Sequence, residues 1–181
     1  MAKTIRRVFT GNNSGLTLVE LILVLTLLLV VLALSLSFFT SMHNSSKMLT
    51  QQAQVQENVI IAKTYIDGKF RYATKLAIHS EGEDSPSGWT ETIYLDEVDG
   101  RGIIFVQKSG GTPSPLLSNL ANDFSMQLTF EKAEDSFIVV AIGCVSEDGY
   151  EYSVENEQFL LGFGPHDLIG ESGDRIYVYG N

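Results

Sequence analysis

The chain has 181 residues and a formal net charge of −10. That length allows one ordinary hydrophobic core and leaves no room for a second large domain. The charge is uneven, because residues 80–181 hold nineteen acids against four bases, a net charge of −15, whereas residues 16–79 carry a net charge of +2. Nucleic-acid-binding proteins need a basic surface, so the acidic C-terminal part argues against direct nucleic-acid binding and favours a cationic partner, if it has one.

Residues 1–15 form a short basic leader. Its charged residues are Lys3, Arg6 and Arg7, and it contains no acid. Basic residues in front of an apolar segment hold the N-terminus in the cytoplasm. We therefore expect residues 1–15 to be a cytoplasmic leader peptide.

Residues 16–39 form a long apolar run. As a helix they would extend about 36 Å, which is enough to cross a hydrocarbon core of about 30 Å. A cleaved secretory signal has a shorter apolar region, and its small-residue cleavage site follows that region. Here the small residue, Gly15, comes before the run. We expect a single transmembrane helix with the C-terminal part of the chain outside the cytoplasm.

Glu20 is the one charged residue within this run. A carboxylate in the membrane costs about 2.5–3.5 kcal/mol even on lenient scales, so such a residue suggests a function. Either Glu20 reaches the lipid interface or it finds a cation. Because residues 16–39 contain no base, the nearest candidate is a new α-amino group, created if the chain is cut before Leu16.

The segment Gly15–Leu21 resembles the class III signal of type IV pilins and of the pseudopilins of type II secretion and competence systems. The resemblance implies that a prepilin peptidase in the membrane cleaves between Gly15 and Leu16 and methylates the amine of Leu16. It also implies that Glu20 pairs with the amine of a neighbouring subunit when an inner-membrane assembly platform builds the filament. Other pilin or pseudopilin subunits, and the membrane lipid, are then the partners.

Two positions depart from the common pattern of the family. Leu16 replaces the usual phenylalanine, and Ser37 stands where major pilins often have a helix-breaking proline. The order of elements also resembles J-type pseudopilins and W-type minor pilins. A minor pilin or pseudopilin is therefore the leading hypothesis, and a major pilin or a membrane-anchored acidic binding module are the alternatives. The sequence leaves open whether the machine serves secretion, competence, adhesion or motility.

Residues 40–79 are predicted to continue the helix with an amphipathic pattern. Apolar residues recur at helical spacing along one side, at Val55, Val59, Ala62, Ile66, Phe70, Ala73 and Ala77. We expect one helix from about Leu16 to about His79, with its second half packed under a sheet.

Residues 80–181 are predicted to form an acidic, β-rich head, which gives an α+β fold with a long N-terminal helix on an antiparallel sheet. Residues 124–131 alternate between apolar and polar, as a half-buried strand does, and 137–145 are apolar on both faces, as in a central strand. Turns at Asp99-Gly100 and at 146–149 predict two hairpins. Residues 176–179 are predicted to add an edge strand.

No pattern in the sequence recommends enzymatic chemistry. Cys144 lies in an apolar run, as a buried core cysteine does. His166 follows Pro165 without a partner motif for a nucleophile. The acidic segment 96–100 suggests calcium, but it lacks the spacing of an EF-hand loop, so a solvated hairpin turn is favoured over a calcium site there. We therefore expect a structural protein without catalytic residues, metal or cofactor.

Overall fold

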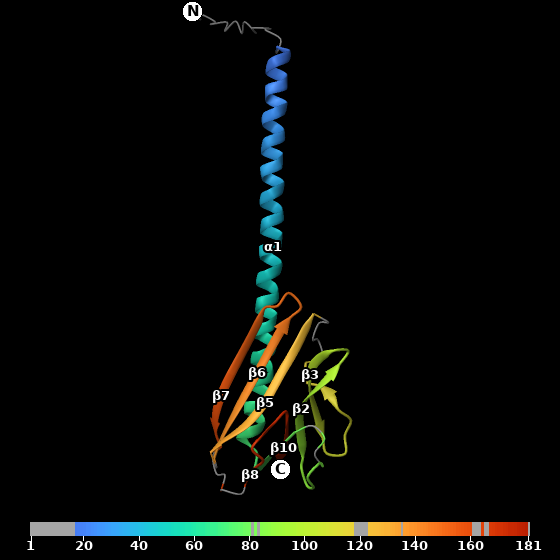
Figure 1. Ribbon diagram of the computed structural model, residues 1–181, viewed down its shortest axis with the longest axis vertical. Coiled ribbons are helices and arrows are strands. Elements are labelled where there is room, and N and C mark those ends of the chain that lie inside the picture. Colours follow the sequence, from blue (N-terminus) through green and yellow to red (C-terminus); the bar gives the residue numbers. More distant parts are fainter. Residues whose placement is uncertain are drawn as a thin grey trace, which may run out of the picture. The chain divides into compact units, whose positions relative to one another are not determined.

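The computed structural model describes residues 17–80, 82, 84–117, 123–134, 136–160, 164 and 167–180. Within them one helix is followed by ten strands (Figure 1). The chain divides into two units, one ending at Lys47 and the other beginning at Met48. Helix α1, Leu18–Arg71, contributes to both units. All the strands belong to the second unit, which we call the head.

The larger sheet of the head has six strands in the order β4-β3-β2-β10-β1-β8. Neighbouring strands are antiparallel except for β1 and β8, which are parallel. In that spatial order the strands are β4 (Ser114–Pro115), β3 (Arg101–Lys108), β2 (Glu91–Val98), β10 (Arg175–Tyr179), β1 (Lys75–His79) and β8 (Leu168–Ile169).

The second sheet has four antiparallel strands in the order β7-β6-β5-β9. They are β7 (Glu151–Phe159), β6 (Phe137–Ser146), β5 (Phe124–Glu134) and β9 (Ser172–Gly173). Strand β6 is central, as its apolar pattern predicts. The amide of Gly102 in β3 donates a hydrogen bond to the Ser125 hydroxyl in β5 at 2.9 Å, so the two sheets meet along these strands. A Cβ on Gly102 would lie 2.1 Å from the carbonyl oxygen of Met126. Only glycine allows this approach.

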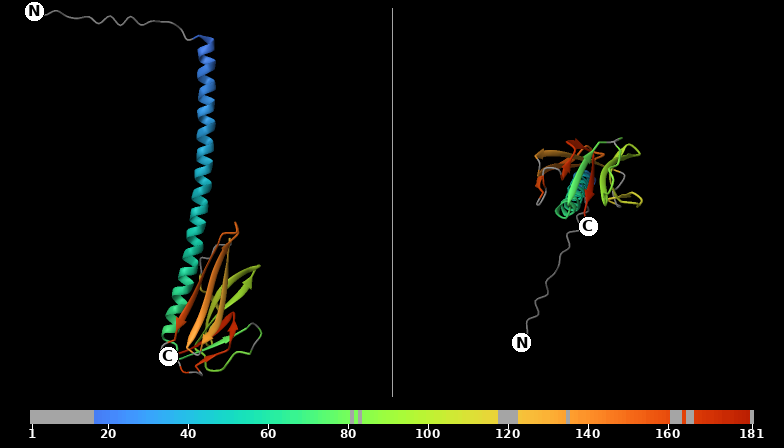
Figure 2. Two further views of the ribbon diagram at one scale, coloured as in Figure 1. Left: turned by 60° about the vertical axis from the view of Figure 1, so that its left-hand side comes forward. Right: turned by 90° about the horizontal axis from the view of Figure 1, so that it is seen from below.

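The hydrophobic core lies between the two sheets and the last part of α1. The predicted helical stripe is confirmed up to Phe70, because Val55, Val59, Ala62 and Ile66 are fully buried and Phe70 is 2% exposed. The core takes inward-facing residues from both sheets, and Figure 2 shows both sheets on one side of this helical segment. Cys144 is buried in this core, as predicted, and burial raises the pKa of its thiol.

The helix ends at Arg71, before the predicted end at about His79. The amides of Tyr72 and Ala73 donate to the carbonyls three residues earlier, which tightens and ends the last turn. The residues that follow form β1, in which Leu76, Ala77 and Ile78 are buried between β10 and β8. Leu76 and Ala77 also fit helical spacing, so the pattern alone does not separate the two structures.

The C-terminal strand β10 is central and not an edge strand, contrary to the prediction. It lies between β1 and β2, and Ile176, Tyr177 and Val178 are all at least 95% buried. The preceding residues connect both sheets, because β8 joins the larger sheet and β9 the smaller one. The C-terminal residues therefore link the two sheets of the head.

The α+β architecture is confirmed, and so are both predicted hairpins. Asp99 and Gly100 have φ values of 53° and 75° between β2 and β3, as the central residues of a type I′ turn require. Strands β6 and β7 pair across the turn that ends at Gly149. The alternation of β5 is confirmed, since Phe124, Met126, Leu128 and Phe130 face the core. The sequence did not predict β1, β4, β8 or β9, nor the division into two sheets.

Replacing Ile66 by alanine should lower the free energy of unfolding of the head by about 2–5 kcal/mol, because its side chain is fully buried. Ile60 is the matched control, since it lies on the same helix and is 54% exposed. Its replacement by alanine should change stability by about 0.5 kcal/mol or less. Chemical unfolding of the full chain in detergent micelles measures both values, and equal losses would contradict the placement of the stripe.

Candidate assembly surface

The first turn of α1 is closed by Thr17 and Glu20. The amide of Glu20 donates to the Thr17 hydroxyl oxygen at 3.3 Å, and the amide of Thr17 donates to Glu20 Oε2 at 3.4 Å. This reciprocal pair is a capping box, which satisfies amides that lack partners at a helix start. It turns the Glu20 carboxylate back towards the N-terminal end of the helix, where the macrodipole also favours a negative charge.

The apolar part of α1 has no cover from the described chain. Between Leu18 and Phe39 every large apolar side chain is more than 50% exposed. The hydroxyls of Thr26 and Ser35 donate to backbone carbonyls one turn earlier, at 2.6 and 2.8 Å. Hydrogen-bonding groups that are satisfied within the helix suit an apolar solvent. Among the described residues, α1 is the one helix long and apolar enough to cross a membrane, so the structure is compatible with a membrane anchor.

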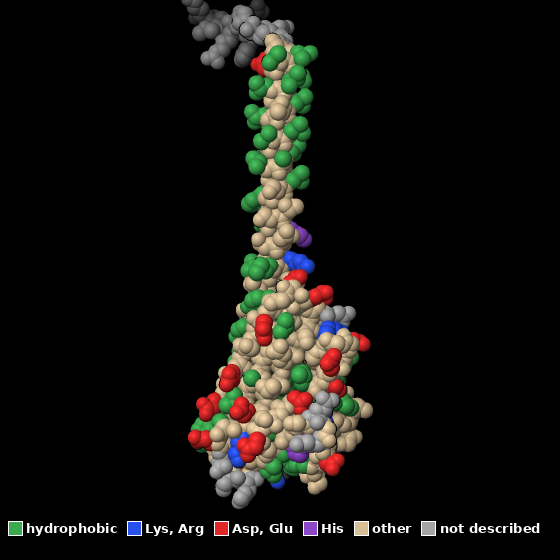
Figure 3. All heavy atoms as spheres, viewed as in Figure 1, with side chains coloured by type: hydrophobic (Ala, Val, Ile, Leu, Met, Phe, Trp, Pro, Cys, Tyr) green, Lys and Arg blue, Asp and Glu red, His purple; other side chains and the backbone are tan. Residues whose placement is uncertain are grey.

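The helix also leaves apolar residues uncovered within the head. Leu49 is 65% and Ile60 is 54% exposed, away from the buried stripe of α1. Gly68 is exposed too, and a Cβ placed on it would meet no atom within 4 Å, so no contact within the described chain requires a glycine there. Figure 3 shows apolar side chains along the N-terminal part of α1 and acidic side chains over the head.

The structure describes only one of the processing and assembly residues that the sequence singled out. Glu20 lies in the first turn of α1 and is exposed. Gly15, Leu16 and the leader charges Lys3, Arg6 and Arg7 lie outside the described residues, as do Pro165 and His166.

The predicted acidic turn at 96–100 is a hairpin turn between β2 and β3. Asp96 accepts a hydrogen bond from the amide of Glu97 at 2.9 Å. Within the described parts of the chain, no group of three or more histidine, cysteine, aspartate or glutamate residues has an arrangement that would hold a metal ion.

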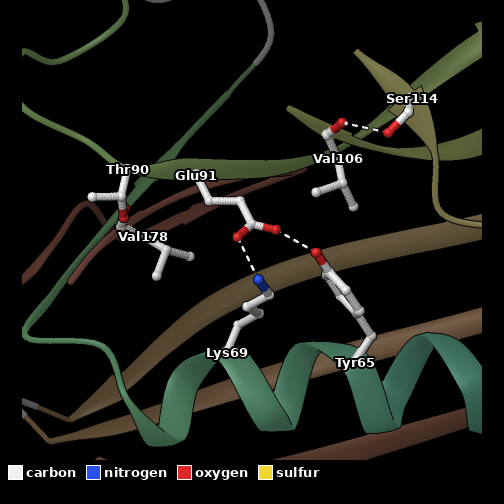
Figure 4. A network of polar contacts seen from close by, with 7 residues as sticks. All are labelled: Tyr65, Lys69, Thr90, Glu91, Val106, Ser114 and Val178. Atoms are coloured by element: carbon white, nitrogen blue, oxygen red, sulfur yellow. Dashed lines mark hydrogen bonds and ion pairs between the residues drawn. The ribbon is translucent and has the colours of Figure 1, made fainter. Parts of the chain in front are cut away.

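A polar network between α1 and β2 was not predicted from the sequence. Tyr65 and Lys69 reach from the helix to the carboxylate of Glu91, which is only 7% exposed at the start of β2 (Figure 4). The Tyr65 hydroxyl donates to Oε1, and the Lys69 ammonium lies 2.5 Å from Oε2. The buried carboxylate therefore has a partner on each oxygen, as a buried charge requires. The spacing of Tyr65 and Lys69 by one helical turn was the available signal, but the sequence did not indicate which strand they face.

The charges in this network shift two pKa values. Burial, and then the hydrogen bond and charge of Glu91, raise the pKa of the Tyr65 hydroxyl. Burial lowers the pKa of Lys69, but the hydrogen bond and charge of Glu91 outweigh that effect and raise it overall. Both protonated forms are therefore favoured in the folded head.

The long helix packed on the two sheets gives the chain a pilin-like α+β fold. Among solved structures it resembles the D319A mutant of the PilB minor pilin from Streptococcus sanguinis, with a TM-score of 0.50. The two share 13% sequence identity over 72% of this chain, and the match spans 35% of that chain. Neither a protein-family model nor a curated protein sequence matches the chain. At this identity the similarity concerns the fold.

Raising the pH should weaken the head through Tyr65 and Lys69. Their ordinary pKa values are 10.0 and 10.5, and both are raised by folding. A raised folded-state pKa contributes stability that is complete below the unfolded value and is lost as the pH rises through the folded value. Wild type should therefore lose more stability above about pH 10 than the Tyr65→Phe, Lys69→Met variant.

Urea unfolding at neutral and alkaline pH measures this difference. Tyr72→Phe is the control, because Tyr72 is 79% exposed, and it should follow the wild-type pH dependence. If the double variant also follows the wild-type curve, the network does not contribute to the alkaline loss.

Proposed function

We propose that the chain is a minor pilin or pseudopilin, a structural subunit of a filament of the type IV pilus, type II secretion or competence kind. The observation that carries the proposal is the position of Glu20, an acid at the start of an uncovered apolar helix, in a chain with a pilin-like fold. In this proposal the subunit is stored in the membrane, with its N-terminus in the cytoplasm and its head outside, and then enters the filament.

Lipid and neighbouring helices cover the apolar segment about equally well, so burial alone does not drive subunits from the membrane into a filament. A charge is different. The carboxylate of Glu20 costs about 2.5–3.5 kcal/mol in lipid, and a cation from the next subunit would offset that cost. The pair would thus give the assembly both a driving force and a fixed register between neighbours.

Cleavage between Gly15 and Leu16 by a prepilin peptidase would supply that cation as the α-amino group of Leu16, which the same enzyme would methylate. The cut leaves the amide of Thr17 intact, because that amide belongs to the bond between Leu16 and Thr17. The capping box therefore survives processing and keeps the Glu20 carboxylate directed towards the new N-terminus.

The acidic head supports a minor role over a major one. Residues 80–181 carry a net charge of −15, and a homopolymer would place many such heads side by side. Like charges on adjacent subunits repel, most strongly at low ionic strength. A subunit that is surrounded by different neighbours avoids this repulsion. Ser37, which stands where major pilins often have a proline, also favours the minor role.

Replacing Gly15 by alanine should block processing. When the wild-type chain is co-expressed with a prepilin peptidase, mass spectrometry should find a mature chain that begins at Leu16, whereas Gly15→Ala should keep residues 1–15. Gly11→Ala is the matched control within the leader and should be cleaved normally. Cleavage of all three chains, or of none, would contradict the assigned site.

Replacing Glu20 by glutamine should leave the chain in the membrane and cut its incorporation into filaments by about tenfold or more, because an uncharged amide cannot pair with the amine. Glu57→Gln removes the other glutamate of α1, which is exposed in the head, and should incorporate normally. Immunoblots of membrane and sheared-filament fractions measure both. Normal incorporation of Glu20→Gln would remove Glu20 from the assembly mechanism.

A further inference from the structure

Strand β7 forms an open edge of the four-stranded sheet. It pairs with β6 through nine residues, Glu151 to Phe159, and no other described strand lies on its second side (Figure 1). Natural proteins protect such edges by making them short, by covering them, or by placing charged residues, proline or a bulge in them. Strand β7 is nine residues long and contains no proline, and the register shift in this sheet lies in β5, so the glutamates of β7 are the protective feature that it carries.

The outer face of β7, turned away from the core, is acidic. Glu151, Glu155 and Glu157 are exposed on it, and their partners on β6 are Val145, Ala141 and Val139. The outward positions of β5, β6 and β7 contain no lysine or arginine. Lys132 is the one basic residue in these strands. It occupies a position on the other face of the sheet, where its partner on β6 is the buried Ile138. No cross-strand cation therefore balances the row of glutamates on this face.

The inner face of β7 is an incomplete part of the core. Tyr152 and Val154 pack against the core cluster but remain half-buried. Their neighbours on β6, Cys144 and Ile142, are almost fully buried because strands flank β6 on both sides. A further strand beside β7 would complete the cover of Tyr152 and Val154 in the same way.

Charge decides which strand fits this edge. Like charges on adjacent strands are destabilising and opposite charges are stabilising. A second copy of β7 would place glutamates beside glutamates, so the row blocks pairing between copies of this chain. The same row favours a strand that carries lysine or arginine at alternate positions, and edge addition of a peptide draws its affinity from the backbone and its selectivity from such positions.

We propose that the free edge of β7 binds an extended segment of a partner protein in which basic and apolar residues alternate. Its basic side chains lie on the outer face beside Glu151, Glu155 and Glu157. Its apolar side chains lie on the inner face against Tyr152 and Val154, and its backbone continues the hydrogen-bonded ladder of the sheet. This site does not depend on whether the chain enters a filament.

The test uses the full chain in non-ionic detergent micelles and a fluorescein-labelled nonapeptide of alternating lysine and valine. Fluorescence anisotropy should show saturable binding that weakens as salt is added. A peptide of the same composition, with its lysines grouped at one end, should bind about tenfold more weakly, because it cannot place charge and apolar groups on separate faces.

Two triple variants with equal changes in net charge separate the edge from the general charge of the head. Glu151→Gln, Glu155→Gln, Glu157→Gln should weaken binding of the alternating peptide about tenfold. Asp96→Asn, Glu97→Gln, Asp99→Asn, in the β2–β3 hairpin, should weaken it about twofold or less. Equal losses in the two variants, equal binding of the two peptides, or no binding by the wild-type chain would each overturn the proposal. Thermal unfolding of both variants confirms that they remain folded.

Discussion

Helix α1 carries two patterns of apolar residues, and the two patterns need different surroundings. In the head, a single stripe that ends at Phe70 is buried by two sheets, so this segment is satisfied by its own chain. Between Leu18 and Phe39 the helix is apolar on every side and the described chain covers none of it. That second segment needs apolar surroundings that the described chain does not provide, and lipid or other helices would supply them.

The acidic residues of the chain lie in three different environments. Glu20 forms a capping box with Thr17 in the first turn of α1 and, in the proposed function, pairs with the amine of a neighbouring subunit. Glu91 is buried and holds the C-terminal part of the helix against β2 through Tyr65 and Lys69. The glutamates of β7 are exposed and, in the proposed edge site, select a basic partner and reject a second copy. What a glutamate can do in this chain thus depends on how deeply it is buried and on which groups lie beside it.

Local patterns in the sequence were sufficient for several features of the fold. The stripe up to Phe70, the alternation of β5, the central position of β6 and the two hairpins are each set by residues that are close in the sequence. Long-range pairing decided the rest. Leu76 and Ala77 fit a helix and a strand equally well, and β10 became central because β1 and β2 enclose it. The partners of Glu91 could not be predicted for the same reason. The sequence did identify Glu20 as an exceptional residue, but not its capping box with Thr17, although the Thr-x-x-Glu spacing was present.

The central claim is that a processed form of this chain is built into a filament through its N-terminal helix. The most direct measurement is mass spectrometry of the chain recovered from purified, sheared filaments of the native host. We expect a minor component whose first residue is Leu16, with the filament fraction free of the unprocessed form. A chain that stays in the membrane fraction with Gly15 and the leader attached, while filaments form without it, would contradict the account.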